Sequence, residues 1–143
     1  MKIKTFIDRD HEEEIIIYAH ERGELVEEIE ALVQSRSSEL VGFKDTAIKP
    51  INVTDVYCFS VEDNKVYAIL EKEKWQIKQR LYSLEDTLDK SFIRINQSCI
   101  ANLKKIERFD VSFGGSFLVI FKNGHRDYVS RRQLKKVKER IGI

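Results

Sequence analysis

The part of the chain after about residue 40 consists mainly of short apolar segments that end at turn signals, and this pattern constrains the fold most strongly. In residues 106–113 apolar and polar side chains alternate, as they do in a strand that has one face on a core. That segment ends at a Gly-Gly pair (114–115). The next, residues 116–122, ends at an Asn-Gly pair (123–124), the strongest two-residue hairpin signal. The pattern predicts a meander of antiparallel strands.

Eight further segments of this part of the chain are strand candidates, and one short helix interrupts them. Residues 56–61 and 65–71 flank a polar turn and should form a hairpin. Ser83 is predicted to cap the short helix, with Leu84 and Leu88 facing inward. The strand candidates are residues 40–44, 47–53, 56–61, 65–71, 75–82, 92–95, 99–101 and 125–129.

The first 40 residues are predicted to form a small ββα segment. Residues 2–7 and 15–18 have strand-like patterns, and a polar connection separates them. Within residues 22–34 the apolar side chains form one stripe of an amphipathic helix, and most of the glutamates lie outside it. These glutamates fit a solvated helix face or, alternatively, a surface that meets a partner or repels DNA. A polar break at 35–38 places a domain boundary near residue 40, so we expect two parts, residues 1–40 and residues 41–143.

The charges of the chain are unevenly distributed. A formal net charge of +1 would by itself argue against nucleic-acid binding. Residues 1–45, however, carry 6 Lys and Arg against 12 Asp and Glu, whereas residues 46–143 carry 19 against 12. A basic part is thus preceded by an acidic leader, and such asymmetry points towards a function.

Several classes of protein are disfavoured. The apolar runs are too short to span a bilayer, and no signal-peptide segment is evident. Cys58 and Cys99 have the pattern of buried free thiols in a cytosolic protein. The histidines at 11, 20 and 125 lack metal-ligand spacing and are expected at the surface, and no nucleotide-binding, zinc-protease or hydrolase motif is present. We therefore expect a cytoplasmic protein without enzymatic activity, catalytic residues, metal, cofactor or small-molecule substrate.

The final helix is predicted to begin at a Ser-x-x-Gln capping box, residues 130–133. Arg131 and Arg132 lie in its first turn, where the helix dipole disfavours each cation by roughly 0.3–1 kcal/mol. Two cations beside unpaired backbone N–H groups favour binding of an anion such as a phosphate. Dipole complementarity explains the later cations of this helix but not these two.

A polar triplet, Asn96-Gln97-Ser98, lies between two apolar segments. It can be a plain loop, but the Gln97 amide also suits bidentate pairing with adenine in a major groove, and Ser98 suits a phosphate contact. The turn at 63–65 is a further polar site. Periodicity alone does not show whether these loops converge.

Residues from about 41 to 143 resemble the LytTR-type DNA-binding domain of bacterial transcription regulators. The resemblance rests on Phe92-x-Arg94, a polar triplet ending in Ser98, Ala101-Asn102-Leu103, Ile106, Lys122-Asn123-Gly124, Val129-Ser130-Arg131-Arg132 and the basic last helix. It implies a mainly β fold of short packed sheets with a C-terminal helix, whose loops enter the major groove of double-stranded DNA. The family usually has His-Arg-Ser or His-Lys-Ser at the triplet, so this chain lacks a cation there, which should shift readout from guanine towards adenine.

In that family three loop positions contact bases, and here they correspond to Lys65, Gln97 and Arg132. By the same correspondence Ser98 and Arg131 contact phosphates or shape loops, and Asn102 is structural. The complete set of expected DNA-binding residues is Asn64, Lys65, Asn96, Gln97, Ser98, Arg131, Arg132 and Lys135.

The resemblance extends to short stand-alone regulators with a small leader, which are often restrained by a membrane protein. The expected function is therefore that of a homodimeric, sequence-specific regulator of transcription, with residues 1–40 in dimerisation or regulation. An RNA-binding β module and a protein-interaction module are the alternatives. Exposed aromatic residues would favour RNA, but five phenylalanines at alternating positions are interpreted mainly as core: Phe92, Phe109, Phe113, Phe117 and Phe121.

Overall fold

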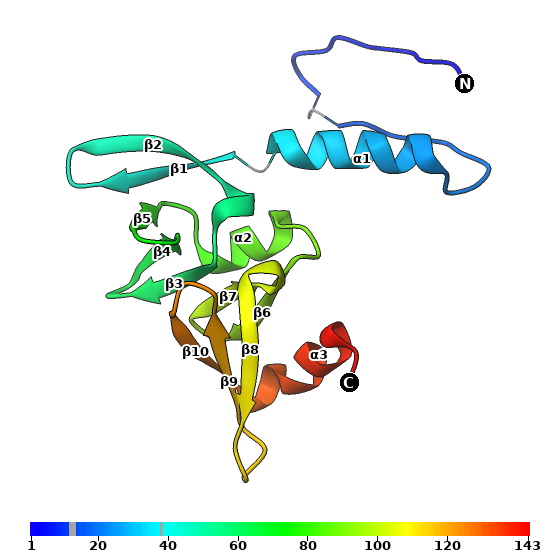
Figure 1. Cartoon of the computed structure of the whole chain (residues 1–143). Helices are drawn as coiled ribbons and strands as arrows, with labels where there is room; N and C mark the ends of the chain where they lie inside the picture. The colour runs from blue at the N-terminus through cyan, green and yellow to red at the C-terminus, as the bar shows by residue number, and fades with distance from the viewer. Residues whose placement is uncertain (12–13, 38) are drawn as a thin grey trace. The chain divides into compact units, whose positions relative to one another are not determined.

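The computed structural model of the chain describes residues 1–11, 14–37 and 39–143 (Figure 1). It divides into two compact units, Met1–Val33 and Gln34–Ile143. Helix α1 (Glu24–Ser37) begins in the smaller unit and confirms the helix that the apolar stripe predicts. Among the described residues no helix is both long and apolar enough to cross a membrane.

The two strands predicted for the leader, at residues 2–7 and 15–18, are not formed in the smaller unit. A strand needs a neighbour that pairs with its backbone, and neither segment has one here. Their apolar side chains stay exposed: the exposed fractions of Ile3, Phe6 and Ile7 exceed four fifths. The local pattern was therefore strand-like, but it lacked the pairing that makes a strand.

The larger unit is mainly β, as predicted, and all ten strands expected there are present, with shifted ends. Seven of them form one antiparallel sheet in the order β2-β1-β5-β4-β3-β7-β6. Their bounds are β1 (Glu39–Lys44), β2 (Ala47–Asn52), β3 (Cys58–Glu62), β4 (Lys65–Ile69), β5 (Lys74–Ile77), β6 (Phe92–Asn96) and β7 (Cys99–Asn102).

The predicted C-terminal meander forms a second antiparallel sheet in the order β10-β9-β8, followed by helix α3 (Arg131–Ile141). Its strands are β8 (Ile106–Val111), β9 (Phe117–Phe121) and β10 (Arg126–Val129). Two short 3-10 turns, Val53–Asp55 and Leu103–Lys105, precede β3 and β8. Asn102 caps the second turn and also donates from Nδ2 to the carbonyl of Val56 at 2.8 Å, so it has the predicted structural role.

Two hydrophobic clusters lie on opposite faces of the seven-stranded sheet, because neighbouring residues of its central strands point in opposite directions. In β3, Phe59 packs in the cluster beside helix α2 (Leu81–Thr87), whereas Cys58 packs in the cluster that β9 and α3 cover. Both side chains are fully buried. Burial of a side chain as large as Phe contributes about 1.5–3 kcal/mol to stability, so this central layer holds the two sheets and α3 together.

Two local predictions for the larger unit are wrong. Helix α2 begins at Leu81 after Arg80, with no side-chain cap, rather than at Ser83. Burial of Leu81 and Leu84 on one face fixes its start instead. Phe113, expected in the core, is fully exposed, because β8 ends at Val111 and the chain turns away from the sheet there.

Candidate nucleic-acid interface

Strands β3 and β4 join in a tight turn that contains Asp63 and Asn64, and Lys65 follows directly. Both turn residues have positive φ, 50° and 63°, as a type I′ hairpin turn requires. Asp and Asn tolerate this conformation better than most residues because their short polar side chains bond locally. The turn therefore holds Asn64 and Lys65 exposed at one edge of the large sheet.

The turn between β6 and β7 lies at the same edge, because β7 pairs antiparallel with β3. The backbone N–H of Val61, near the end of β3, donates to the carbonyl of Ser98 at 2.9 Å. This bond places the β6–β7 turn, which presents the exposed residues Gln97 and Ser98, beside the β3–β4 turn.

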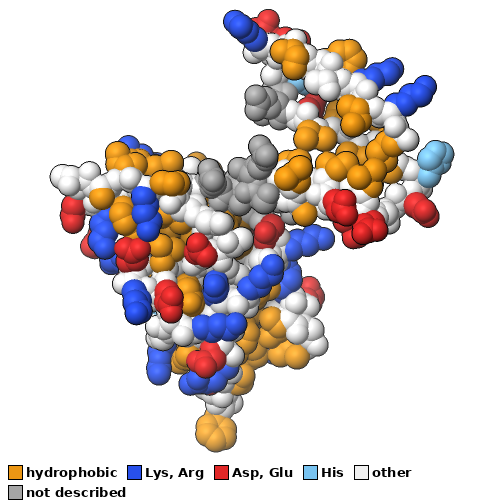
Figure 2. Space-filling view, turned by 45° about the horizontal axis from the view of Figure 1, so that its top comes forward, with side chains coloured by type: hydrophobic (Ala, Val, Ile, Leu, Met, Phe, Trp, Pro, Cys, Tyr) orange, Lys and Arg blue, Asp and Glu red, His pale blue; other side chains and the backbone are white. Residues whose placement is uncertain are grey.

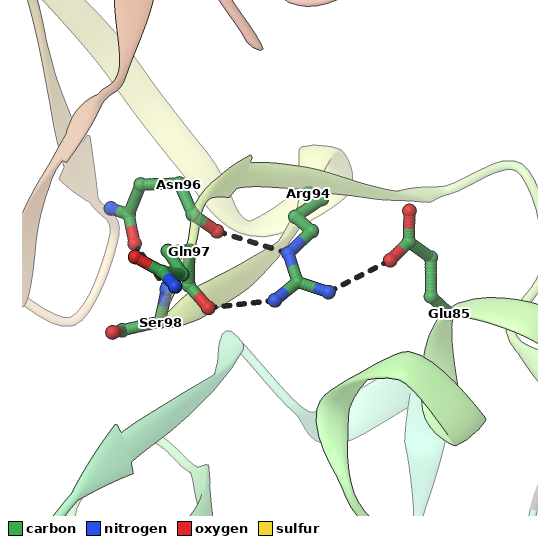
Figure 3. A network of polar contacts seen from close by, with 5 residues as sticks. All are labelled: Glu85, Arg94, Asn96, Gln97 and Ser98. Atoms are coloured by element: carbon green, nitrogen blue, oxygen red, sulfur yellow. Dashed lines mark hydrogen bonds and ion pairs between the residues drawn. The ribbon is translucent and has the colours of Figure 1, made fainter. Parts of the chain in front are cut away.

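Arg94 holds the β6–β7 turn in shape (Figure 3). Its guanidinium donates from Nε to the carbonyl of Asn96 at 3.2 Å and from Nη2 to the carbonyl of Gln97 at 2.6 Å. From Nη1 it also reaches the Glu85 carboxylate, at 2.9 Å. The planar fork of Arg suits such a set of acceptors, whereas the ammonium of Lys does not reproduce it. The turn residues are thereby fixed through their backbones, and the Gln97 amide is left exposed.

Asn96 connects this turn to the third one, at the beginning of α3. Its Oδ1 accepts from the N–H of Ser98 at 2.8 Å, and its Nδ2 donates to Asp127 Oδ1 at 2.9 Å and to the carbonyl of Tyr128 at 2.7 Å. Only 2% of Asn96 is exposed. Of the expected DNA-binding residues, this one is buried and holds the loops in place.

The α3 start lies beside the end of β6, because the N–H of Ser130 donates to the carbonyl of Ile95 at 2.8 Å. Ser130 caps the helix as predicted, and its hydroxyl accepts from the N–H of Gln133 at 3.3 Å. Arg131 and Arg132 follow in the first turn, both exposed, and Lys135 lies one turn after Arg131.

The β3–β4 turn, the β6–β7 turn and the α3 start thus form one edge of the larger unit, here called the three-turn edge. In the described part of the chain, the side chains of its cations Lys65, Arg131 and Arg132 form no hydrogen bond or ion pair with the protein. Elsewhere many cations are paired, for example Lys74 with Glu62 at 2.6 Å. In Figure 2 the visible face of the larger unit accordingly mixes blue and red side chains. Unpaired cations at exposed loops are available to an anionic ligand.

Sequence reasoning missed the residues that shape this edge, namely Arg94, Glu85 and Asp127. Arg94 contributed to the family resemblance. Its role, however, depends on the backbone carbonyls of Asn96 and Gln97, and the sequence pattern does not show how the turn directs these carbonyls. Asp127 is 31 residues from Asn96 along the chain, so no local signal joins them.

The two cysteines lie in the interior of the larger unit, although Cys99 directly follows Ser98 of the β6–β7 turn. Cys58 and Cys99 are free and buried, as predicted, and no described group of His, Cys, Asp and Glu side chains is arranged to hold a metal ion. A hydrogen bond from Cys99 lowers the pKa of Cys58 to about 7, with a smaller contribution from His125, although burial opposes the shift. The same bond and burial raise the pKa of Cys99. His125 is half-buried rather than at the surface.

Comparison with known proteins gives consistent results. The LytTr DNA-binding domain family matches residues 46–142. Two Staphylococcus aureus relatives, from strain NCTC 8325 / PS 47 and strain bovine RF122 / ET3-1, are 39% and 38% identical to this chain. Each alignment covers 100% of this chain and 99% of the relative, and both relatives bear the name uncharacterized HTH-type transcriptional regulator.

A solved structure, the LytTr DNA-binding domain of a methyl-accepting/DNA response regulator from Bacillus cereus, is 26% identical and superimposes with a TM-score of 0.70. The superposition covers 74% of this chain and 98% of that domain. The relatives' name refers to a helix-turn-helix, yet in the described part of this chain five strands separate α1 from α2, and five separate α2 from α3. The fold, the sequence match over residues 46–142 and the relatives aligned along the whole chain together show that this protein belongs to the LytTr DNA-binding domain family.

Proposed function

We propose that this chain is a transcription regulator that binds specific sequences of double-stranded DNA, with the three-turn edge in the major groove. The observation that carries the proposal is the convergence of the three turns. This convergence gathers exposed amides and unpaired cations, the groups that read base edges and hold phosphates. The family membership and the name of the relatives support the same function.

Within this edge the side chains divide into two roles. Gln97 and Arg132 are the base readers, since an amide pairs bidentately with adenine and a guanidinium with guanine. Asn64 and Lys65 contact bases or phosphates from the β3–β4 turn. Arg131, Ser98 and Lys135 bind phosphates, which fixes the position of the protein on the duplex but carries no sequence information.

DNA is favoured over single-stranded RNA because the aromatic side chains of the larger unit are mostly inside. Sequence-specific RNA recognition uses exposed aromatic rings on which unpaired bases stack. Of the five phenylalanines at alternating positions, Phe92, Phe117 and Phe121 are buried in the two clusters, Phe109 is half-buried, and Phe113 alone is exposed.

We further propose that the protein acts in the cytoplasm as a homodimer on two similar half-sites. Two-fold symmetric dimers bind half-sites about one helical turn of DNA apart. The smaller unit, with its exposed apolar side chains, is the part proposed for dimerisation or for restraint by a membrane protein.

Selection of binding sites from random duplexes with the purified full chain tests the proposal. We expect an enriched, repeated sequence, and on it Arg132→Ala should weaken binding by about 1–3 kcal/mol. Lys72→Ala is the matched control, because Lys72 is an exposed cation in the β4–β5 connection, at the opposite end of β4 from the β3–β4 turn. An unchanged affinity of both Arg132→Ala and Gln97→Ala would contradict the assignment of the site. The absence of any enriched sequence would contradict the function itself.

A further inference from the structure

The β8–β9 hairpin ends in an aromatic residue that the core does not use. Phe113 has an exposed fraction of 114%, and Val111 beside it is 60% exposed. In Figure 1 this hairpin projects beyond the rest of the larger unit, and in Figure 2 its outermost tip is apolar. Burial does not account for a phenylalanine at this position.

The tip has a defined turn that presents Phe113 outward. The N–H of Ser112 donates to the carbonyl of Ser116 at 3.0 Å, and the N–H of Gly115 donates to the carbonyl of Ser112 at 2.9 Å. The two serine hydroxyls also bond each other at 2.6 Å. Gly115 has φ of 80°, so the loop is a three-residue turn that ends in a left-handed glycine. Because the turn fixes the backbone that carries the ring, less conformational entropy is lost when the ring binds.

The tip extends from the same end of the small sheet as the α3 start. Phe117 pairs with Val111 on one side and with Val129 on the other, and Val129 directly precedes the helix cap. The hairpin tip therefore continues the three-turn edge on the side of α3. A ligand that covers Arg131 and Arg132 comes close to this tip.

The chemistry of the tip differs from that of the three turns. Between Phe109 and Phe121 the only charged residue is Asp110, so the tip has no cation for a phosphate. An apolar side chain on a narrow projection instead resembles the wedges that enter the minor groove and partly unstack a base step. The minor groove is the next groove reached when a protein in the major groove extends across one backbone.

We infer that Phe113 is a wedge that enters the minor groove beside the half-site and bends the DNA there. The inference rests on the proposed function, because it requires the three-turn edge to lie on DNA. Partial unstacking of a step bends the duplex towards the major groove of that same step, which faces away from the wedge. The wedge would thus add a contact that depends on how easily the flanking step deforms.

The test measures affinity and DNA bending for the full chain on its selected duplex, with fluorescence energy transfer between dyes at the two DNA ends. Phe113→Ala should bind about tenfold more weakly and leave the DNA straighter, whereas Phe113→Leu should keep most of the bend. Ile48→Ala, which removes an apolar side chain 67% exposed on edge strand β2, is the control and should change neither quantity. Because Phe113 makes no core contact, the unfolding midpoint should stay unchanged in both Phe113 variants.

The outcomes separate this inference from the proposed function. Wild-type bending and affinity in Phe113→Ala, together with weaker binding by Arg132→Ala, would overturn the wedge and leave the function standing. Weaker binding by Phe113→Ala with an unchanged bend would also overturn it. Loss of transcription activation or repression in a purified system, with DNA binding and bending intact, would assign the tip to a protein partner instead. Failure of the wild-type chain to bind any duplex would overturn both.

Discussion

Asn96 and Gln97 are neighbours in the chain, yet their amide groups have opposite surroundings. Asn96 is buried with three hydrogen bonds, to the N–H of Ser98, to Asp127 and to the carbonyl of Tyr128. Gln97 contributes only its backbone carbonyl to the local network, through Arg94, and its side chain is exposed. One amide therefore supports the structure, while the other is available to a ligand.

This contrast predicts that the two alanine variants have different effects. Asn96→Ala leaves partners on both sides of the turn unsatisfied and should lower the free energy of unfolding by about 1–3 kcal/mol. Gln97→Ala should change that free energy by less than about 0.5 kcal/mol while it weakens binding to the selected duplex. Chemical denaturation of the full chain measures the first effect and titration with DNA the second. Equal stability of the two variants would contradict the supporting role of Asn96.

The residue types at this turn could be read from the sequence, but their roles could not. The polar triplet predicts a loop, and the family resemblance selects it as a site. Two of the three partners of Asn96 follow it by more than 30 positions, so its burial depends on how two sheets pack and not on the local pattern.

At the scale of elements, β1 is kept close to its neighbours by a glycine. A Cβ on Gly42 would lie 2.3 Å from Cδ1 of Ile51 and 2.8 Å from Cβ of Trp75, well inside contact distance. Strand β1 pairs between β2 and β5 at this point, and the buried side chains of Ile51 and Trp75 from these neighbours leave no room for a methyl group.

Gly42→Ala should therefore destabilise the protein by about 1–3 kcal/mol, the usual cost of overpacking a core. Gly114→Ala is the comparison, because its nearest neighbour would be a serine hydroxyl at 3.9 Å. We expect the urea midpoint to fall for the first variant and to stay close to wild type for the second. A midpoint for Gly42→Ala as high as that of Gly114→Ala would show that the strand can move aside.

Elements were predictable where the signal is local. The ten strands of the larger unit follow from alternation and from turn residues such as Asn123-Gly124, both of which act over a few positions. The start of α2 and the leader segments were predicted wrongly because they depend on partners. Leu81 begins its helix through burial, and residues 2–7 lack a strand to pair with.

At the scale of the whole molecule, the near-neutral net charge is the sum of two opposed units. Met1–Val33 carries 4 Lys and Arg against 10 Asp and Glu, and Gln34–Ile143 carries 21 against 14. The split could be counted from the sequence. The convergence of the three turns could not, because it depends on the order of strands in the sheet and on the position of α3 beside β6.

Removal of Met1–Val33 should strengthen non-specific binding to duplex DNA at low salt. The deletion takes away a net charge of −6 and leaves a unit of net charge +7, so attraction to phosphates increases. The Debye length is about 10 Å at 0.1 M salt and about 3 Å at 1 M, so the advantage of the shortened chain should shrink as salt is added. Titration of both chains with a duplex of unrelated sequence, at several salt concentrations, measures this difference in affinity.

Equal or weaker binding by the shortened chain at low salt would mean that the leader does not oppose DNA binding through its charge. A loss confined to duplexes with two half-sites would instead identify it as the dimerisation unit.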